Sequence, residues 1–417
     1  MAWSVSVVGA FDRFNYGDVL FSRISEHLIK TALPDAEIEF FALRRADLRT
    51  QGGVATRPLS ELYRKRPPDD GHHLVMVAGG EVLAPTWAQM AEHLVPPRLS
   101  GALKRLHRRT GYAFWNPLWQ RIGGCANRLP WTIDPSSLPA PDRTFICYNA
   151  VGGTSLGALT KADIAWQAKA LSQAAWTTVR DAPTADAVVA RGLPRPAVRP
   201  DSAVVMRDLL PPGQERRLRN ALFARSGAVP KRYLAVQIAR KWLQGTETAL
   251  IDGLAEVHRK SGLQIVPFAI GRAAGHDDHV AADKICARLK GCPWVTRLPH
   301  DLTVSEIMAL IAGADVYVGT SLHGNITAFA YNKPRVGLLP HLAKVVGFRD
   351  AWDLPEMPAG VEIPQLAGAV DTALSLAGGS APAQAKVFYE SSFRDMIIEL
   401  RDAVGHCSEA QNLERAA

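Results

Sequence analysis

Short apolar segments alternate with helical patterns along the first half of the chain. Several of these segments are rich in β-branched and aromatic residues, as buried strands are. Strands are predicted at residues 5–9, 37–42, 74–78, 144–148, 176–180 and 197–200. Residues 19–32 carry apolar side chains at helical spacing. This alternation predicts an α/β fold, in which helices flank a parallel sheet.

The second half of the chain repeats the pattern. Strands are predicted at residues 233–238, 264–269 and 294–297, and helices at residues 246–261, 280–289 and 303–312. A stretch rich in proline and charge, from residue 209 to residue 230, separates the two series. We therefore expect two Rossmann-like domains facing across a cleft, at residues 1–210 and 230–375, followed by a C-terminal helix and tail at residues 376–417. Ligands of open α/β sheets bind beyond the carboxyl ends of the strands, so the site is expected in that cleft.

The composition is that of a globular protein, but it does not identify a ligand. Of 417 residues, 47% are hydrophobic and 21% charged, as in soluble globular proteins. The 48 Lys and Arg exceed the 40 Asp and Glu, and the net charge of +8 suits anionic ligands or surfaces. Five scattered cysteines without a CxxC pair argue against a disulfide framework or a zinc site. The start of the chain lacks a signal-peptide pattern and no run is long enough to span a membrane, so a cytoplasmic location is expected.

One segment, residues 101–131, breaks the alternation. It mixes basic residues with aromatic ones: Lys104, Arg105, His107, Arg108, Arg109, Tyr112, Phe114, Trp115, Trp119, Arg121, Arg128 and Trp131. Such a mixture can seat a helix at a membrane interface or stack on sugars. The alternative is an inserted helical lid whose aromatic rings fill the core.

The loop from Gly319 to Gly324 carries the clearest chemistry. It follows an apolar run that reads as a strand, and it precedes a helical pattern beginning near Asn325. Backbone N–H groups at a helix start can hold an anion, and the imidazole of His323 stands beside them. Together they predict an active site.

Several loops that follow predicted strands form an ordered series. In chain order they are Phe14-Asn15-Tyr16-Gly17-Asp18, Ala78-Gly79-Gly80-Glu81, Val179-Arg180-Asp181, Pro200-Asp201 and Ser321-Leu322-His323-Gly324-Asn325. Each motif is common alone, but their order and position are specific. From about residue 5 to residue 337 the chain resembles the polysaccharide pyruvyl transferase family.

The resemblance implies a fold like that of inverting GT-B glycosyltransferases and an activity in polysaccharide or exopolysaccharide synthesis. Pyruvate would move from phosphoenolpyruvate to a sugar of a polysaccharide or lipid-linked glycan, forming a cyclic ketal and releasing phosphate. No metal, organic cofactor or nucleic acid is expected as a partner. Peripheral membrane contact through residues 101–131 is a further expectation.

The resemblance also assigns roles to residues. His323 would be the general acid or base, and Arg180 would bind an anionic group. Asn15, Gly17 and Asp18 would line the acceptor side, Asp18 with a catalytic role. The other expected substrate-binding residues are Gly79, Gly80, Glu81, Ser321, Leu322, Gly324 and Asn325. From the residues alone, Asp18 and Glu81 also fit helix capping, and Arg180-Asp181 also fits a surface ion pair.

Ser321 departs from the family pattern, because that position is usually an arginine. Arginine is the natural fork for phosphate or carboxylate, so another cation is needed. Arg240, Lys241 and Arg272 follow strands that end at the same cleft, which makes them the expected substitutes. Two alternatives stay open: a glycosyltransferase that uses a nucleotide sugar, and a glycan-binding protein without catalytic activity.

Overall fold

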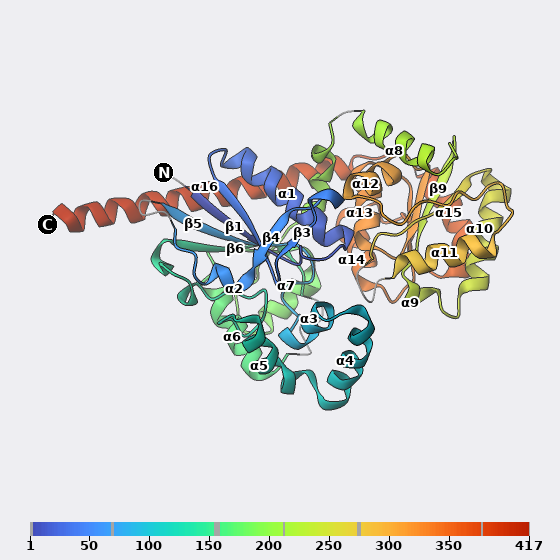
Figure 1. Cartoon of the computed structure of the whole chain (residues 1–417). Coiled ribbons are helices and arrows are strands. Elements are labelled where there is room, and N and C mark those ends of the chain that lie inside the picture. The colour runs from blue at the N-terminus through green and yellow to red at the C-terminus, as the bar shows by residue number, and fades with distance from the viewer. Residues whose placement is uncertain are drawn as a thin grey trace.

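The computed structural model describes residues 3–67, 71–153, 159–211, 213–272, 277–376 and 378–416, without the side chains of residue 97 and of residues 403–416. Figure 1 shows two α/β halves side by side, the first in blue to green and the second in yellow to orange. Each half has one parallel sheet with helices on its faces. The predicted fold class, two Rossmann-like domains in a GT-B-like arrangement, is confirmed.

The sheet of the first half has the order β3-β4-β2-β1-β5-β6-β7-β8. All its pairings are parallel except that of β3 with β4. The strands are β1 (Trp3–Val8), β2 (Glu37–Ala42), β3 (Ala46–Asp47), β4 (Ala55–Pro58), β5 (His72–Ala78), β6 (Thr144–Val151), β7 (Trp176–Val179) and β8 (Ala197–Val198). The central strands β1 and β5 are buried along their whole length, as their continuous apolar runs predict.

The second half has a smaller sheet with the order β10-β9-β11-β12-β13. Its strands are β9 (Tyr233–Gln237), β10 (Gln264–Pro267), β11 (Val316–Gly319), β12 (Arg335–Leu338) and β13 (Ala359–Val361). The predicted strand at residues 294–297 is wrong. Those residues make only an isolated bridge, between Val295 and Ile265, in a segment bounded by Pro293 and Pro299 that is too short to pair further.

Helices connect the strands and cover the sheets. The first half contains α1 (Tyr16–Ala32), α2 (Leu59–Leu62), α3 (Trp87–Leu94), α4 (Pro97–Thr110), α5 (Tyr112–Gly123), α6 (Lys161–Ser172) and α7 (Ala182–Val189). The second contains α8 (Gln214–Arg225), α9 (Arg240–Leu243), α10 (Glu247–Ser261), α11 (Asp278–Arg288), α12 (Val304–Ala312), α13 (Leu322–Ala330), α14 (Ala343–Trp352) and α15 (Leu366–Ser375). The 3₁₀ segments are η1 (Arg49–Gln51), η2 (Pro135–Ser137), η3 (Pro141–Arg143), η5 (Ser202–Leu209) and η6 (Ile363–Gln365).

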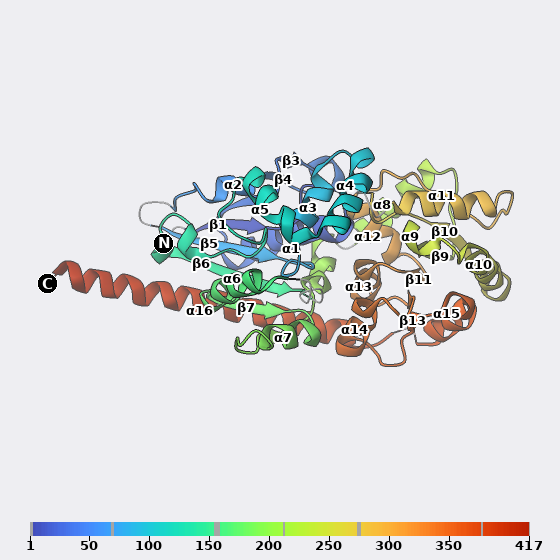
Figure 2. The ribbon, with the colours of Figure 1, turned by 90° about the horizontal axis from the view of Figure 1, so that it is seen from below.

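The basic and aromatic insertion forms the helices α4 and α5. They lie with α3 below the first sheet in Figure 1, and Figure 2 views them from that side. His107 is completely buried, and Tyr112, Trp115 and Trp119 surround its ring at centroid distances of 5.5, 5.8 and 6.2 Å. Most aromatic rings of the insertion therefore pack inward, as the lid alternative predicted.

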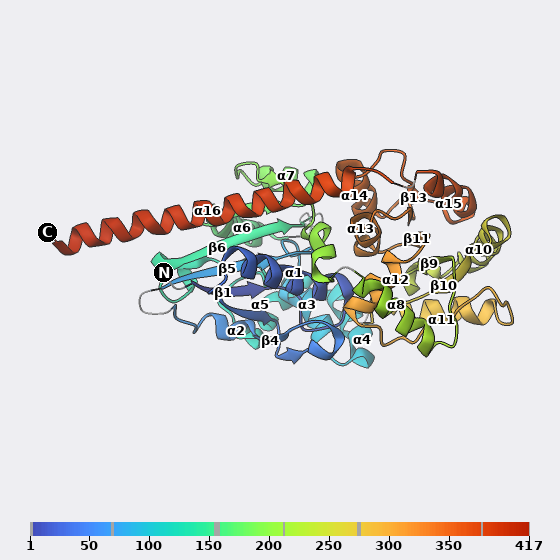
Figure 3. The ribbon, with the colours of Figure 1, turned by 90° about the horizontal axis from the view of Figure 1, so that it is seen from above.

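The chain crosses between the two halves twice. After η5 it enters the second half at α8, and after α15 the helix α16 (Ala381–Ala416) returns over the first half. Figure 3 shows α16 running along the first sheet. The contacts are specific, because Asn149 Nδ2 donates to Tyr389 Oη at 2.7 Å and Arg199 Nε donates to Ser392 Oγ at 2.6 Å. The last helix thus ties the end of the chain to the half in which it began.

Candidate functional site

A cavity of about 670 Å³ lies where the carboxyl ends of both sheets meet. From the first half it is lined by the start of α1, by Gly79 and Gly80 after β5, and by Arg180 after β7. From the second half it is lined by Gln237 at the end of β9 and by the loop between β11 and α13. This is the position at which parallel α/β sheets bind ligands, and it is the cleft predicted from the sequence.

His323 lies in this cavity at the start of α13. Its side chain is 14% exposed, and the ring of Phe21 meets it edge-on at a centroid distance of 5.0 Å. Burial is the main cause that lowers its pKa to about 4, although the nearby carboxylate of Asp201 acts in the opposite direction. At neutral pH the imidazole is therefore uncharged.

Gly17 gives the ring of His323 its space. A Cβ atom at position 17 would lie 1.9 Å from Nδ1 of His323, so any larger residue would displace the imidazole. The start of α1 also contacts α13 directly, since Tyr16 Oη and Thr327 Oγ1 are 2.8 Å apart. The sequence grouped Gly17 with the acceptor site, but in the structure it backs the histidine and does not line the cavity.

Arg180 is buried among three carboxylates. Its guanidinium nitrogens lie 2.9 Å from Glu81, 3.3 Å from Asp201 and 3.6 Å from Asp181. These partners raise the pKa of Arg180 against the opposing effect of its burial. The surface ion-pair alternative is wrong. The residue is held in place at the cavity wall, with much of its charge already compensated.

Asp201 connects this cluster to the histidine. One of its carboxylate oxygens, Oδ2, lies 3.9 Å from His323 Nε2 and 3.3 Å from Arg180, while Oδ1 accepts the N–H of Ala203 at 3.0 Å. Its side chain is almost fully buried. Asp201 thus caps η5, and it also faces the imidazole. A carboxylate in that place can orient the ring and stabilise its charged form.

Ser321 works as a helix cap in the place where the family pattern has arginine. Its Oγ accepts the N–H of Gly324 at 3.2 Å, and its own N–H donates to Gln237 Oε1 at 3.0 Å. Asn325 is buried behind the loop, where its Nδ2 donates to the carbonyl of Ser321 at 2.9 Å. Two of the N–H groups expected to hold an anion are thus already paired, that of Gly324 within the loop and that of Ser321 with Gln237 of β9.

Lysines supply the positive charge of the cavity. Lys241, Lys104 and Lys344 line it from α9, α4 and α14. The side chain of Lys344 is open to the cavity, yet the surrounding protein lowers its pKa, with Arg180 and Lys241 acting in the same direction. Burial also lowers the pKa of Lys241. No ion pair compensates these lysines within the described part of the chain, so the cavity favours an anion.

Of the three substitutes expected for the missing arginine, only Lys241 lines the cavity. Arg240 is exposed on the outer side of α9, 4.0 Å from Asp277. Arg272 points elsewhere: it donates to the carbonyl of His300 and to Gln51, and its guanidinium lies over the ring of Phe14 at 3.9 Å. Neither guanidinium reaches the ligand space.

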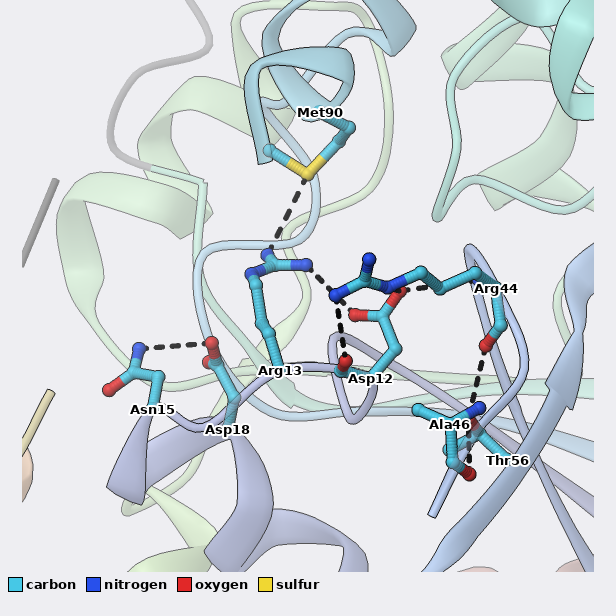
Figure 4. Close-up of polar contacts among 8 residues, drawn as sticks. All are labelled: Asp12, Arg13, Asn15, Asp18, Arg44, Ala46, Thr56 and Met90. Carbon is cyan, nitrogen blue, oxygen red and sulfur yellow. Dashed lines mark hydrogen bonds and ion pairs between the residues drawn. The ribbon is translucent and has the colours of Figure 1, made fainter. Parts of the chain in front are cut away.

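The residues expected on the acceptor side of the first half make short polar contacts, shown in Figure 4. Asn15 Nδ2 donates to Asp18 Oδ2 at 3.0 Å, and both residues line the cavity. Asp18 lies in the first turn of α1, whose N-cap is Asn15 without a side-chain capping hydrogen bond, so Asp18 lines the cavity but does not cap the helix. Beside them, Arg13 pairs with Asp12 at 3.0 Å and also lines the cavity.

Asp278 is a buried carboxyl in the same cavity. Its Oδ2 accepts from Gln237 Nε2, from the N–H of Gly271 at 2.9 Å and from the N–H of Ile270. Its Oδ1 has no hydrogen-bond partner among the described residues. Burial raises the pKa of Asp278 to about 6, which leaves this acid partly protonated near neutral pH. No group of three potential metal ligands occurs among the described residues; His276 lies outside them.

The structure thus brings together most of the predicted residues and adds others. The cavity is lined by Asn15, Asp18, Gly79, Gly80, Glu81, Arg180, Lys241, Ser321, Leu322 and His323. Gly17, Gly324 and Asn325 support it from behind, and Arg240 and Arg272 lie apart. Lys344, Lys104 and Asp278 also line the cavity, and this position was not predicted from the sequence. Lys344 follows β12, a strand that was not predicted, and it could have been found from that position.

Comparison with known proteins agrees with the fold and with the resemblance. Residues 151–341 match the model of the polysaccharide pyruvyl transferase family, so the resemblance is confirmed over the segment that holds Arg180 and His323. No curated protein matches the chain.

Solved structures resemble the chain in fold. The UDP-GlcNAc 2-epimerase of Methanocaldococcus jannaschii has a TM-score of 0.54 at 11% identity, covering 95% of this chain and 99% of the epimerase. The Neisseria meningitidis enzyme, bound to UDP-GlcNAc, has a TM-score of 0.52 at 10% identity, covering 96% and 99%. The Rickettsia bellii enzyme has a TM-score of 0.51 at 11% identity, covering 97% and 98%. These likenesses show a GT-B fold.

Proposed function

We propose that this protein transfers pyruvate from phosphoenolpyruvate to two hydroxyls of a glycan sugar, forming a cyclic ketal and releasing phosphate. The observation that carries the proposal is the position of His323. In a segment that matches the pyruvyl transferase family, its neutral imidazole shares a cavity with cationic side chains. The donor carries a carboxylate and a phosphate, and such a cavity favours both.

Lys344 and Lys241 take the part of the arginine that Ser321 replaces. Both are open to the cavity. Desolvation by the surrounding protein is the main cause that lowers their pKa values, and repulsion from neighbouring positive charges acts in the same direction. A bound dianion would relieve that repulsion and would stabilise their charged forms. Arg180 contributes less, because Glu81, Asp181 and Asp201 already compensate its charge.

His323 acts as the base in this proposal. With a pKa of about 4 it is free to accept a hydroxyl proton at neutral pH. The hydroxyl oxygen attacks C2 of the donor as the methylene carbon gains a proton. The imidazolium then formed is stabilised by Asp201, whose Oδ2 lies 3.9 Å from Nε2.

Asp278 is our candidate for the acid that protonates the methylene. It lines the cavity, its Oδ1 has no hydrogen-bond partner among the described residues, and its raised pKa of about 6 keeps a protonated fraction available. A second sugar hydroxyl then attacks C2 and gives its proton to the carboxylate that Asp278 has become. The bond between C2 and the phosphate oxygen breaks, and phosphate leaves with the electron pair of that bond.

The acceptor is proposed to be a sugar of a polysaccharide or a lipid-linked glycan, held near Asn15 and Asp18. We place the reaction in the cytoplasm. The free thiols of Cys125, Cys147, Cys286 and Cys292 support a reducing compartment.

Binding of the donor tests the proposal without knowledge of the acceptor. Calorimetric titration with phosphoenolpyruvate should show saturable binding, while UDP-GlcNAc should show none. Turnover is followed as phosphate released in the presence of methyl glycosides with paired hydroxyls. His323→Ala should lower it by about 10²- to 10⁴-fold.

The opposite binding result would reject pyruvyl transfer. Binding of UDP-GlcNAc without binding of phosphoenolpyruvate would assign the cavity to a nucleotide sugar. Acceptor binding that persists when neither donor binds would indicate a glycan-binding protein.

A further inference from the structure

The outward side of helices α4 and α5 is unlike the rest of the surface. Ten large hydrophobic side chains are exposed in the described part of the chain, and five of them belong to these two helices. They are Leu99, Leu106, Phe114, Leu118 and Ile122. Exposed apolar residues gathered in one place mark an interaction surface, whereas scattered ones do not.

The apolar residues of α5 form one stripe. Phe114, Leu118 and Ile122 are spaced by four residues, which places them on a single face of the helix, and they are 72%, 46% and 63% exposed. The adjoining face carries Trp115 and Trp119, whose rings pack on His107. The inward packing is therefore complete without the stripe, whose side chains stay exposed and can contact a partner.

Helix α4 adds charge beside its own apolar residues. Leu99 and Leu106 share one face, seven residues apart. Arg98, Arg105 and Arg109, spaced by seven and then four residues, lie on the adjoining face, and all three are exposed. A helix with aliphatic and arginine stripes side by side is suited to the interface of an anionic membrane.

Acidic residues are absent from this region. Between Glu92 and Asp134 the sequence contains seven Lys and Arg and no Asp or Glu. Within the described part of the chain, no ion pair engages the three exposed arginines of α4 or Arg121 of α5. A second copy of this surface would bring like charges together, whereas anionic lipid headgroups would compensate them.

The same helix reaches the cavity with its other side. Lys104 and Arg108 of α4, with Tyr112 of α5, belong to the cavity lining. We infer that the outward face of α4 and α5 docks on an anionic lipid surface, with the cavity mouth beside that surface. A saccharide carried on a membrane lipid could then enter the cavity while its lipid stays in the bilayer. The docking depends on side chains outside the cavity, so it is independent of the proposed chemistry.

Vesicle sedimentation tests the inference on the full chain. At low salt the protein should sediment with vesicles of equal parts phosphatidylcholine and phosphatidylglycerol, and it should stay in solution with phosphatidylcholine alone. The triple variant Arg98→Gln, Arg105→Gln, Arg109→Gln should bind the mixed vesicles about 100-fold more weakly. Phe114→Ser, Leu118→Ser, Ile122→Ser should weaken binding at high salt as well, because apolar burial is not screened.

Matched variants in the second half provide the control. Arg216→Gln, Arg217→Gln, Arg259→Gln removes three exposed arginines from α8 and α10, and Val229→Ser removes an exposed apolar side chain. Both should bind vesicles as the wild type does. Phosphate release in solution and the unfolding temperature should be unchanged in all four variants.

Three results would overturn the inference. The first is equal sedimentation with both kinds of vesicle. The second is equal loss of binding in the variants of α4 and α5 and in their controls in the second half. The third is a wild-type dimer that the serine variant dissociates while vesicle binding stays the same. That result would assign the face to a second copy of the chain.

Discussion

At the scale of single residues, Lys344 is proposed to supply the positive charge that Ser321 lacks. Ser321 caps α13 and cannot bind a phosphate as arginine would. Lys344 approaches the same cavity from α14, more than twenty positions later in the chain.

Replacement of Lys344 tests this compensation. Lys344→Met keeps the length of the side chain and removes the charge, so the KM for phosphoenolpyruvate should rise by about 10- to 100-fold. Lys344→Arg should retain most of the affinity. Lys290→Met, an exposed lysine outside the cavity, is the matched control and should have no effect. An unchanged KM in Lys344→Met would exclude this lysine from donor binding.

The lowered pKa of His323 predicts that the unfolding free energy depends on pH. Its folded pKa of about 4 lies below the ordinary value of 6.5, so the unfolded chain binds the proton more tightly. The wild type should lose about 3 kcal/mol of unfolding free energy as the pH falls from 6.5 to 4, with no contribution above pH 6.5. His323→Gln should lack this loss, which denaturant titrations at several pH values would measure. Parallel curves for both proteins would show that the ring is not buried in its neutral form.

The site residues that could be predicted from the sequence are those that follow a recognisable strand in the chain. His323, Arg180 and Asp18 each follow a recognisable strand, so their place at the cleft could be predicted. The sequence could not show that Arg272 turns away toward Gln51 and His300, because both partners are distant in sequence. Nor could it show that Asp201 faces His323, a contact that depends on how the halves pack.

At the scale of elements, the start of α1 is shaped by the start of α13. Gly17 lies inside α1, where glycine is normally unfavourable, and the imidazole of His323 occupies the space that a side chain would need. The helix thus gives up some intrinsic stability to bring Asp18 and His323 into one cavity. Strand and helix positions were largely predictable from apolar periodicity, whereas this contact was not.

Gly17→Ala should separate the effect of Gly17 on the stability of α1 from its effect on the position of the His323 ring. The added methyl group would displace the ring of His323, and turnover should fall by about 10²-fold. Gly347→Ala in α14, where nothing lies within 4 Å of the added atom, is the control. That variant should gain about 0.5–1 kcal/mol of stability and keep full activity. Full activity in Gly17→Ala would mean that the ring position is not critical.

At the scale of the whole molecule, α16 joins the last residues to the first half. Tyr389 is buried and accepts a hydrogen bond from Asn149 of β6, and Arg401 donates to the carbonyl of Ala32 at 2.9 Å. The two-half architecture could be predicted from the order of strands. The return of the last helix over the first half could not, because its apolar residues do not indicate which surface they cover.

Removal of one hydroxyl tests this attachment. Tyr389→Phe leaves the amide of Asn149 without its partner, and it should cost about 1–3 kcal/mol of unfolding free energy. Tyr63→Phe is the matched control, because the buried hydroxyl of Tyr63 has no hydrogen-bond partner among the described residues. That variant should be neutral or slightly more stable. Equal losses in the two variants, compared by urea denaturation, would show that the α16 contact contributes nothing specific.

The two halves are joined by more than the peptide segments that connect them. Asn15 of the first half pairs through its backbone with Gly271 of the second, and Tyr16 Oη lies 2.8 Å from Thr327 Oγ1. Both contacts stand beside the cavity, because Asn15 and His323 line it. Separating the halves would break both contacts, so the shape of the cavity depends on the same junction that holds the halves together.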